Sequence, residues 1–176
     1  MSIDARAARI KLLLFDIDGV LTDGRVVIHA DGTESKAFGI RDGIAIVWAQ
    51  RAGLKVGFLS ARASATTLHR AAQLGVTLVH QAVKKSKVAA YLDILADEGL
   101  TDDEVAFMGD DIVDLAVLGR VGLAAAPLNA VEDVRQRVHF VSQYNGGGGA
   151  VRELVELVLR ATNRWDGIVA NYLNES

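Results

Sequence analysis

Short apolar runs alternate with amphipathic segments along most of the chain. Six runs of four to seven residues are bounded by glycine or charged residues, and most are too short to be helices. Several are apolar on both faces, which is typical of strands buried between two layers of helices. The predicted strands are IKLLLF (10–15), LKVGFLS (54–60), VTLVH (76–80), EVAFMG (104–109), GLAAA (122–126) and HFVS (139–142).

Segments with helical spacing lie between these runs, and three of them end at a glycine suited to a helix C-terminus. They are DGIAIVWAQRAG (42–53), ASATTLHRAAQLG (63–75) and SKVAAYLDILADEG (86–99). Thr101 and Glu104 have the spacing of a capping box, for which we predict a single helical turn at most. The alternation of strands and helices predicts an α/β fold with a doubly wound, Rossmann-like parallel sheet.

One segment interrupts this alternation. RVVIHADGTESKAFGI (25–40) has two short β-prone arms around Asp31-Gly32, which is a hairpin turn signal. Because it follows the first strand directly, we predict a β-hairpin flap at about residues 24–40, standing over the strand ends. No segment is long enough for a separate cap domain, so residues 1–176 are predicted to form a single domain.

The composition is that of a globular protein, since 51% of the 176 residues are hydrophobic. A net charge of −3 gives no general reason to expect nucleic acid or an anionic membrane as a partner. The absence of cysteine excludes disulfides, thiolate metal sites and a cysteine nucleophile. The N-terminus has no signal-peptide core, and no apolar run approaches the roughly 20 residues that span a bilayer. We therefore expect a cytoplasmic protein.

Two acids stand where the first predicted strand ends, in KLLLFDIDGVLTDG (11–24). Asp16 and Asp18 lie on the same side of an extended chain, because alternate residues share a face. They can be exposed loop acids, but Gly19 lets the chain turn tightly over them. A hard divalent cation such as Mg²⁺, which takes oxygen ligands, is the simplest way to stabilise both.

A second acidic cluster, GDDIVD (109–114), follows another predicted strand. Asp110 or Asp111 can cap the next helix, but capping leaves the other carboxylates unexplained. Asp114 is four residues beyond Asp110 and can share its face. Since ligands bind beyond the carboxyl ends of parallel strands, Asp16 and Asp110 are expected on one rim of the sheet.

A hydroxyl and a lysine complete the candidate chemistry. Ser60 ends another predicted strand on the same rim, where it can also be an ordinary helix cap. Lys84, Lys85 and Lys87 form a basic run that can equally be a solvated helix start. Taken with the acids, Ser60 and a lysine describe a site for Mg²⁺ and a phosphoryl group.

These residues resemble the four motifs of the haloacid dehalogenase (HAD) superfamily of phosphohydrolases. The motifs are DIDGVLT (16–22), LSAR (59–62), Lys87 and GDDIVD (109–114), in the order found in that superfamily. Within it, TDGRVVIHADGTESKAFGIRDG and GGGGAVRELVELVL resemble the capless branch that hydrolyses 3-deoxy-D-manno-octulosonate 8-phosphate (KDO 8-phosphate) in lipopolysaccharide precursor synthesis. A phosphatase of a nine-carbon, sialic-acid-like sugar 9-phosphate is the alternative.

The resemblance implies a two-step mechanism. Asp16 would attack phosphorus and form an aspartyl-phosphate, while Asp18 would protonate the leaving oxygen and later deprotonate water. Mg²⁺ would be bound by the Asp16 carboxylate, the Asp18 backbone carbonyl and Asp110. Ser60 and Lys87 would bind the phosphoryl oxygens. The spacing before the lysine is one residue longer than usual in the family, which leaves Lys84 as an alternative to Lys87.

The resemblance also implies how a sugar acid phosphate would be recognised. Arginine side chains offer planar forks that suit its carboxylate and phosphate. The loop GIRDG (39–43), at the foot of the flap, would contact the substrate. The implied substrate-binding residues are Asp18, Gly39, Ile40, Arg41, Asp42, Gly43, Arg62, Arg70 and Lys87.

Relatives of this kind are homotetramers, in which a neighbour's C-terminal segment can close the active site. The tail at about residues 164–176 has apolar residues at helical spacing, which suits this role, but it can also pack on its own domain. Where some relatives carry a basic residue, this chain has Gly148, so that position offers no positive charge to a substrate.

Two other classes of protein share parts of the pattern. A receiver-type phosphoacceptor domain also pairs acids after its first strand, but its accepting aspartate ends a central strand, where this chain has Ser60. A dinucleotide-binding module would use GGGG (146–149), but the G-x-G-x-x-G spacing after a first strand is absent. The four ordered motifs favour the phosphatase over both.

Overall fold

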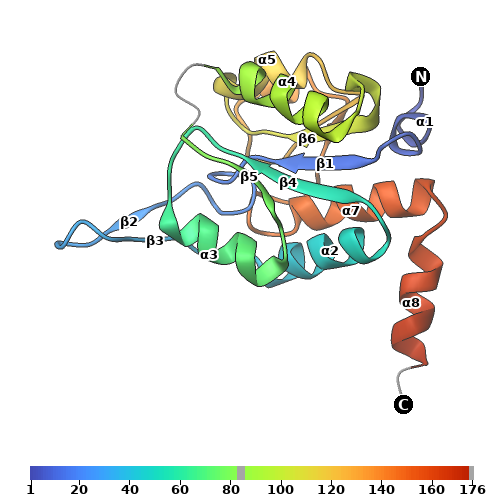
Figure 1. The fold of residues 1–176 in the computed structure, drawn as a ribbon, viewed down its shortest axis with the longest axis horizontal. Helices are drawn as coiled ribbons and strands as arrows, with labels where there is room; N and C mark the ends of the chain where they lie inside the picture. Colours follow the sequence, from blue (N-terminus) through green and yellow to red (C-terminus); the bar gives the residue numbers. More distant parts are fainter. Residues whose placement is uncertain (83–85, 175–176) are drawn as a thin grey trace.

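A six-stranded parallel sheet forms the centre of the protein in a computed structural model, which describes residues 1–82 and 86–174 (Figure 1). The strand order is β5-β4-β1-β6-β7-β8, so the chain winds outward from β1 in both directions. The predicted doubly wound sheet and its six strands are confirmed. The strands are β1 (Leu12–Phe15), β4 (Lys55–Leu59), β5 (Leu78–His80), β6 (Val105–Met108), β7 (Leu123–Ala126) and β8 (Phe140–Val141).

Helices cover both faces of the sheet, as Figure 1 shows. In β1, Leu13 and Phe15 pack with α2 and α7, whereas Leu12 and Leu14 pack with α4 and α5 on the other face. All four side chains are buried, which explains why the strand is apolar on both faces. The helices are α1 (Ile3–Ala7), α2 (Ile40–Arg51), α3 (Ala65–Leu74), α4 (Lys87–Glu98), α5 (Leu115–Leu118), α6 (Glu132–Arg135), α7 (Ala150–Ala161) and α8 (Trp165–Leu173), with 3₁₀ turns η1 (Asp102–Glu104) and η2 (Ile112–Asp114).

The predicted flap is a hairpin with short arms. Strands β2 (Val27–Ile28) and β3 (Glu34–Ser35) pair antiparallel, and the Asp31 carboxylate accepts a hydrogen bond from the backbone N–H of Thr33 at 2.9 Å. The hairpin projects beyond the carboxyl ends of the central strands (Figure 1). Between β1 and α2 the described chain holds this hairpin and no cap domain.

The C-terminal helix α8 packs on its own chain at the end of the molecule away from the hairpin (Figure 1). The indole N–H of Trp48 donates to the Tyr172 hydroxyl at 3.0 Å, and the Trp48 and Trp165 rings meet edge to face at 5.6 Å. Packing on its own domain is therefore one role of this tail, and its reach to a neighbouring subunit stays a prediction. Among the described residues, no helix has the length and apolarity needed to cross a membrane.

Candidate active site

Three predicted site residues follow neighbouring strands at the same edge of the sheet. Asp16 comes directly after β1 and Ser60 directly after β4, while Asp110 lies two residues after β6. The backbone N–H of Asp16 donates to the carbonyl of Met108 at 3.0 Å, so the β1–β6 ladder continues to Asp16. The register of the parallel strands thus brings residues far apart in the sequence to one rim.

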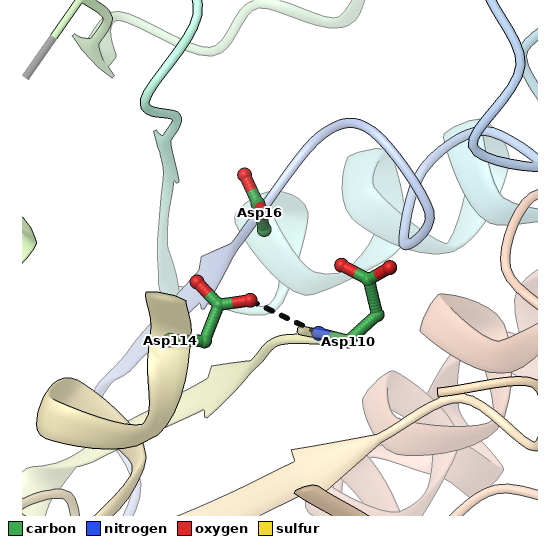
Figure 2. A group of neighbouring side chains, drawn as sticks. All are labelled: Asp16, Asp110 and Asp114. Atoms are coloured by element: carbon green, nitrogen blue, oxygen red, sulfur yellow. Dashed lines mark hydrogen bonds between the residues drawn. The ribbon is translucent and has the colours of Figure 1, made fainter. Parts of the chain in front are cut away.

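A cluster of three carboxylates occupies this rim. The side chains of Asp16, Asp110 and Asp114 lie together there (Figure 2), with one oxygen of each within 4.8 Å of the others. Asp114 was not among the predicted metal ligands, although its spacing of four from Asp110 predicted a shared face. The 3₁₀ turn η2 brings Asp114 back beside Asp110. Asp111 caps this turn by accepting from the Ile112 N–H at 2.7 Å.

Lys87 lies among these carboxylates. Its Nζ is 2.9 Å from Oδ2 of Asp16 and 2.5 Å from Oδ1 of Asp114, and its side chain is buried. Ser86 caps α4 and accepts from the Val88 N–H at 3.1 Å, which starts the helix at Lys87. The alternative, Lys84, lies outside the described residues. Lys87 is therefore the described lysine that contacts Asp16.

Asp114 positions the other groups of the cluster. Its second oxygen accepts the backbone N–H of Asp110 at 3.0 Å, which Figure 2 marks, and that of Asp111 at 3.3 Å. The Asp114 side chain is fully buried, and protein donors occupy both of its oxygens: Lys87 at Oδ1 and the two backbone N–H groups at Oδ2. Asp114 therefore orients Lys87 and the Asp110 loop. Asp16 also accepts the Ile17 N–H and contacts Lys87, whereas the Asp110 carboxylate accepts none of the described hydrogen bonds and is the most open of the three to a cation.

The acids of the cluster have raised pKa values. Burial, followed by the charge of Asp114, raises the pKa of Asp16 to about 6, against the opposing effect of Lys87. Burial and the neighbouring acids raise the pKa of Asp110 to about 7. Burial alone would lower the pKa of Lys87, but Asp16 and Asp114 outweigh it and the pKa is raised. One ammonium does not neutralise three carboxylates, so the donor set fits a hard divalent cation such as Mg²⁺.

Glycines allow two loops to close over the cluster. A Cβ on Gly19 would lie 2.0 Å from Oδ2 of Asp110, and Gly19 has a φ of +93°. A Cβ on Gly146 would lie 1.8 Å from the Gly19 carbonyl oxygen. The GGGG segment therefore packs against the turn after β1, and this close approach accounts for glycine there without a dinucleotide ligand.

Asp18 lies beside two cations. Arg62 Nη1 is 3.2 Å from Oδ2 of Asp18, and Lys36 Nζ is 2.7 Å from Oδ1. Arg62 is thus at the site, as predicted, whereas Lys36 and its neighbour Glu34 were missed. Glu34 and Lys36 are two residues apart, and alternate residues of a strand share a face. This spacing was the available signal that both side chains point the same way from the flap.

Ser60 is buried at the end of β4. Its hydroxyl oxygen accepts the backbone N–H of Arg62 at 3.3 Å, and its own N–H donates to the His80 carbonyl at 2.9 Å. These contacts fix the start of the LSAR motif beside Asp16's strand.

The predicted substrate loop, residues 39–43, is mostly the first turn of α2. Gly39 is its N-cap, Ile40 is exposed, and Gly43 is buried against the guanidinium of Arg70. Arg70 also donates to the Gly39 carbonyl at 3.3 Å, so it braces this turn from α3. Arg41 is exposed and lines a pocket of about 440 Å³ beside α7.

Asp42 differs from the prediction. Its carboxylate is buried and accepts the backbone N–H groups of Gly149 at 3.1 Å and Arg152 at 2.9 Å, at the start of α7. Burial raises its pKa, and the α7 N–H donors oppose that effect. Asp42 therefore joins α2 to α7 and does not face a substrate. The sequence could not reveal this, because the partner helix is more than a hundred residues away.

Replacing Asp42 with alanine is expected to destabilise the fold. The change leaves backbone donors at the start of α7 unpaired, which costs about 1–3 kcal/mol of unfolding free energy. Urea unfolding followed by circular dichroism measures it. The matched control is Asp97→Ala, at an exposed acid on α4, which is expected to change stability by less than about 0.5 kcal/mol. Equal effects of the two changes would contradict the capping role.

Comparison with known proteins identifies the class to which this fold and site belong. The haloacid dehalogenase-like hydrolase family matches residues 66–154. The chain is also 36% identical over 162 residues to the 3-deoxy-D-manno-octulosonate 8-phosphate phosphatase KdsC of Escherichia coli K12, covering 92% of this chain and 86% of that protein. The chain belongs to the haloacid dehalogenase-like hydrolase family.

Two solved structures resemble it over nearly the whole chain. The 3-deoxy-D-manno-octulosonate 8-phosphate phosphatase of Yersinia pestis has a TM-score of 0.92 and 36% identity, covering 94% of this chain and 89% of that one. The phosphatase of the same name from Moraxella catarrhalis, in complex with magnesium, phosphate and KDO, has a TM-score of 0.93 and 32% identity, covering 97% of both chains.

Proposed function

We propose that the protein is a Mg²⁺-dependent phosphatase that hydrolyses KDO 8-phosphate to KDO and phosphate. The observation that carries this proposal is the placement of Asp16 at the end of β1, with Lys87 Nζ at 2.9 Å and Asp110 in the same carboxylate cluster. Similarity to KDO 8-phosphate phosphatases over 92% of the chain supports the substrate. The nine-carbon alternative has no support among the relatives reported above.

In the first step, an oxygen of Asp16 attacks phosphorus, and the bond from phosphorus to the sugar oxygen breaks. Asp18 gives its proton to that departing oxygen. In the second step, Asp18 takes a proton from water, the water oxygen attacks phosphorus, and the bond to Asp16 breaks. Phosphate leaves, and Asp16 and Asp18 return to their starting states.

Other residues of the rim bind and orient the phosphoryl group. Lys87 faces Asp16 and supplies positive charge to the phosphoryl oxygens, and Ser60 donates its hydroxyl. Asp16, Asp110 and the Asp18 carbonyl would hold Mg²⁺, which would supply charge neutralisation for the phosphoryl group. Arg62 would bind the carboxylate of the sugar acid. Gly39, Ile40, Arg41 and Arg70 would shape the remaining sugar pocket.

The affinity for Mg²⁺ is expected to depend on pH. Because the pKa of Asp110 is about 7 and that of Asp16 about 6, protons compete with the cation below neutrality. Between pH 8 and pH 6 the affinity should fall by about tenfold or more. Calorimetric titration in two buffers of different ionisation enthalpy measures both the affinity and the proton release. An equal affinity for Mg²⁺ at both pH values would contradict the competition between protons and the cation.

Phosphate release from a panel of sugar phosphates tests the function. We expect kcat/KM for KDO 8-phosphate to exceed that for nine-carbon sugar acid 9-phosphates by about tenfold or more. Activity should be lost with EDTA and restored with Mg²⁺. A uniformly weak response to every sugar phosphate would contradict the substrate assignment while leaving the phosphatase chemistry in place.

The proposal includes the setting of the enzyme. Residues 1–176 act as a single domain in the cytoplasm, and four copies form a homotetramer. The exposed apolar side chains of the flap, Val27 and Ile28, are available for contact between copies. In the tetramer the tail would reach a neighbouring active site. Sedimentation of the protein with and without residues 164–176 tests this arrangement.

A further inference from the structure

The flap places a buried ammonium against the carboxylate of Asp18. Lys36 Nζ lies 2.7 Å from Oδ1, and only 1% of the Lys36 side chain is exposed. Arg62, from the opposite side of the site, lies 3.2 Å from Oδ2. Each oxygen of Asp18 is therefore contacted by a different cation, one carried by the hairpin and one by the loop after β4.

Glu34 lies beside both cations and hydrogen-bonds one of them, Arg62. Its Oε2 accepts from Arg62 Nη2 at 2.8 Å, its Oε1 accepts from the Ser64 hydroxyl, and Lys36 Nζ is 3.8 Å away. The Glu34 carbonyl also accepts from the Thr66 hydroxyl at 3.3 Å, which ties the flap to α3. The Ser64 hydrogen bond, with the charges of Lys36 and Arg62, lowers the pKa of Glu34.

A buried lysine is a costly choice if stability alone is considered. Taking an ammonium out of water costs free energy that a single ion pair often does not recover. Among the described residues, Lys36 Nζ and Asp18 Oδ1 also have no hydrogen-bond partner, so their contact is an ion pair without good hydrogen-bond geometry. Stability alone therefore does not account for a lysine at this position.

We propose that Lys36 is a positioning residue for proton transfer by Asp18. It holds Oδ1 of Asp18, so that Oδ2 is the oxygen that gives its proton to the departing sugar oxygen. The flap then serves the chemistry of its own chain as well as substrate choice. This inference rests on the proposed function and on the acid/base role of Asp18.

The test compares Lys36→Met with the wild-type enzyme on two substrates. Methionine keeps roughly the length of the lysine side chain but removes its charge. With KDO 8-phosphate, whose alkoxide leaving group needs a proton, kcat should fall by about 10²-fold while KM stays within about threefold. With p-nitrophenyl phosphate, whose phenolate leaves with little protonation, kcat/KM should fall by less than about fivefold. A structural or phosphate-binding role would reduce kcat/KM equally for both substrates.

Three further variants keep the result interpretable. Lys36→Arg retains the charge and should recover most of the kcat lost in Lys36→Met. Glu34→Gln should also lower kcat for KDO 8-phosphate, because it removes the negative charge that lies beside both cations. Lys55→Met is the matched control: Lys55 pairs with Glu98 at the opposite edge of the sheet, and kcat should not change. Thermal unfolding checks that each variant is folded.

The possible outcomes separate this inference from the proposed function. A raised KM at unchanged kcat, or no rescue by arginine, would overturn the positioning role while the wild-type activity stands. If the wild-type enzyme did not hydrolyse KDO 8-phosphate, the proposed function would fail. The same variant comparison on another alkyl phosphate that the enzyme does hydrolyse would still decide the role of Lys36.

Discussion

Asp16→Asn is expected to abolish phosphate release, with a loss in kcat of about 10⁴-fold or more. The carboxamide cannot form the aspartyl-phosphate, and no other described carboxylate combines the strand-end position of Asp16 with contact to Lys87. Release of phosphate from KDO 8-phosphate under saturating Mg²⁺ measures the effect. Acid-quenched wild-type enzyme should carry phosphate that hydroxylamine removes, and the variant should carry none.

The Asp16 variant should remain folded. The raised pKa of about 6 means that folding disfavours the ionised carboxylate, so Asp16 subtracts stability as the pH rises from 3.8 to about 6. A neutral amide removes that effect, keeps an oxygen to accept the Ile17 N–H, and leaves Lys87 paired with Asp114. The melting temperature at pH 7.5 should therefore not fall. Wild-type turnover in the folded variant would rule out Asp16 as the nucleophile.

Asp23→Asn provides the matched control. Asp23 is an exposed aspartate in the loop after β1, and its carboxylate accepts only the backbone N–H of Arg25 among the described hydrogen bonds. It receives the same chemical change seven residues away, outside the carboxylate cluster. We expect its kcat to stay within about twofold of wild type.

Local periodicity was sufficient to predict the sheet because buried strands are apolar on both faces, as β1 and β6 are. The rule that ligands bind beyond the carboxyl ends of parallel strands then placed Asp16, Ser60 and Asp110 together. Lys87 required the family resemblance, since a lysine at a helix start has an ordinary solvated alternative. Its contact with Asp16 shows that Lys87 lies in the site and is not a solvated lysine at a helix start.

The rest of the site depends on contacts that no local pattern encodes. Lys36 meets Asp18, and Glu34 meets Arg62, only because the hairpin lies against the loop after β4, where Thr66 of α3 donates to the Glu34 carbonyl. The family resemblance placed Asp42 at the substrate, but its carboxylate turns inward to α7. In both cases the deciding partner is a segment distant in sequence.

Lys87→Met is expected to lower both stability and activity. The change leaves the carboxylates of Asp16, Asp110 and Asp114 within 4.8 Å of one another without their buried cation. Removing one partner of a buried ion pair costs about 3–5 kcal/mol, which is roughly 6–20 °C in melting temperature for a chain of this size. Loss of charge at the phosphoryl group should reduce kcat by about 10²–10³-fold. Thermal unfolding and phosphate release measure the two effects.

The control for this change is Lys11→Met. Lys11 is an exposed lysine that pairs with Glu104 at 2.6 Å on the protein surface, where a salt bridge contributes about 0–1 kcal/mol. Its effect on stability should therefore be small and its kcat unchanged. If Lys87→Met were no more destabilising than Lys11→Met, the buried ammonium would not be compensating the acids.

Two measurements distinguish charge compensation from simple loss of packing. Mg²⁺ should raise the melting temperature of Lys87→Met more than that of wild type, because the cation supplies the missing positive charge. Adding Asp114→Asn to Lys87→Met should recover part of the stability, since it removes one uncompensated acid and keeps an oxygen for the Asp110 N–H. Activity should not return, because the phosphoryl group still lacks its ammonium. Stability that stays low in the double variant would point instead to lost packing around the lysine side chain.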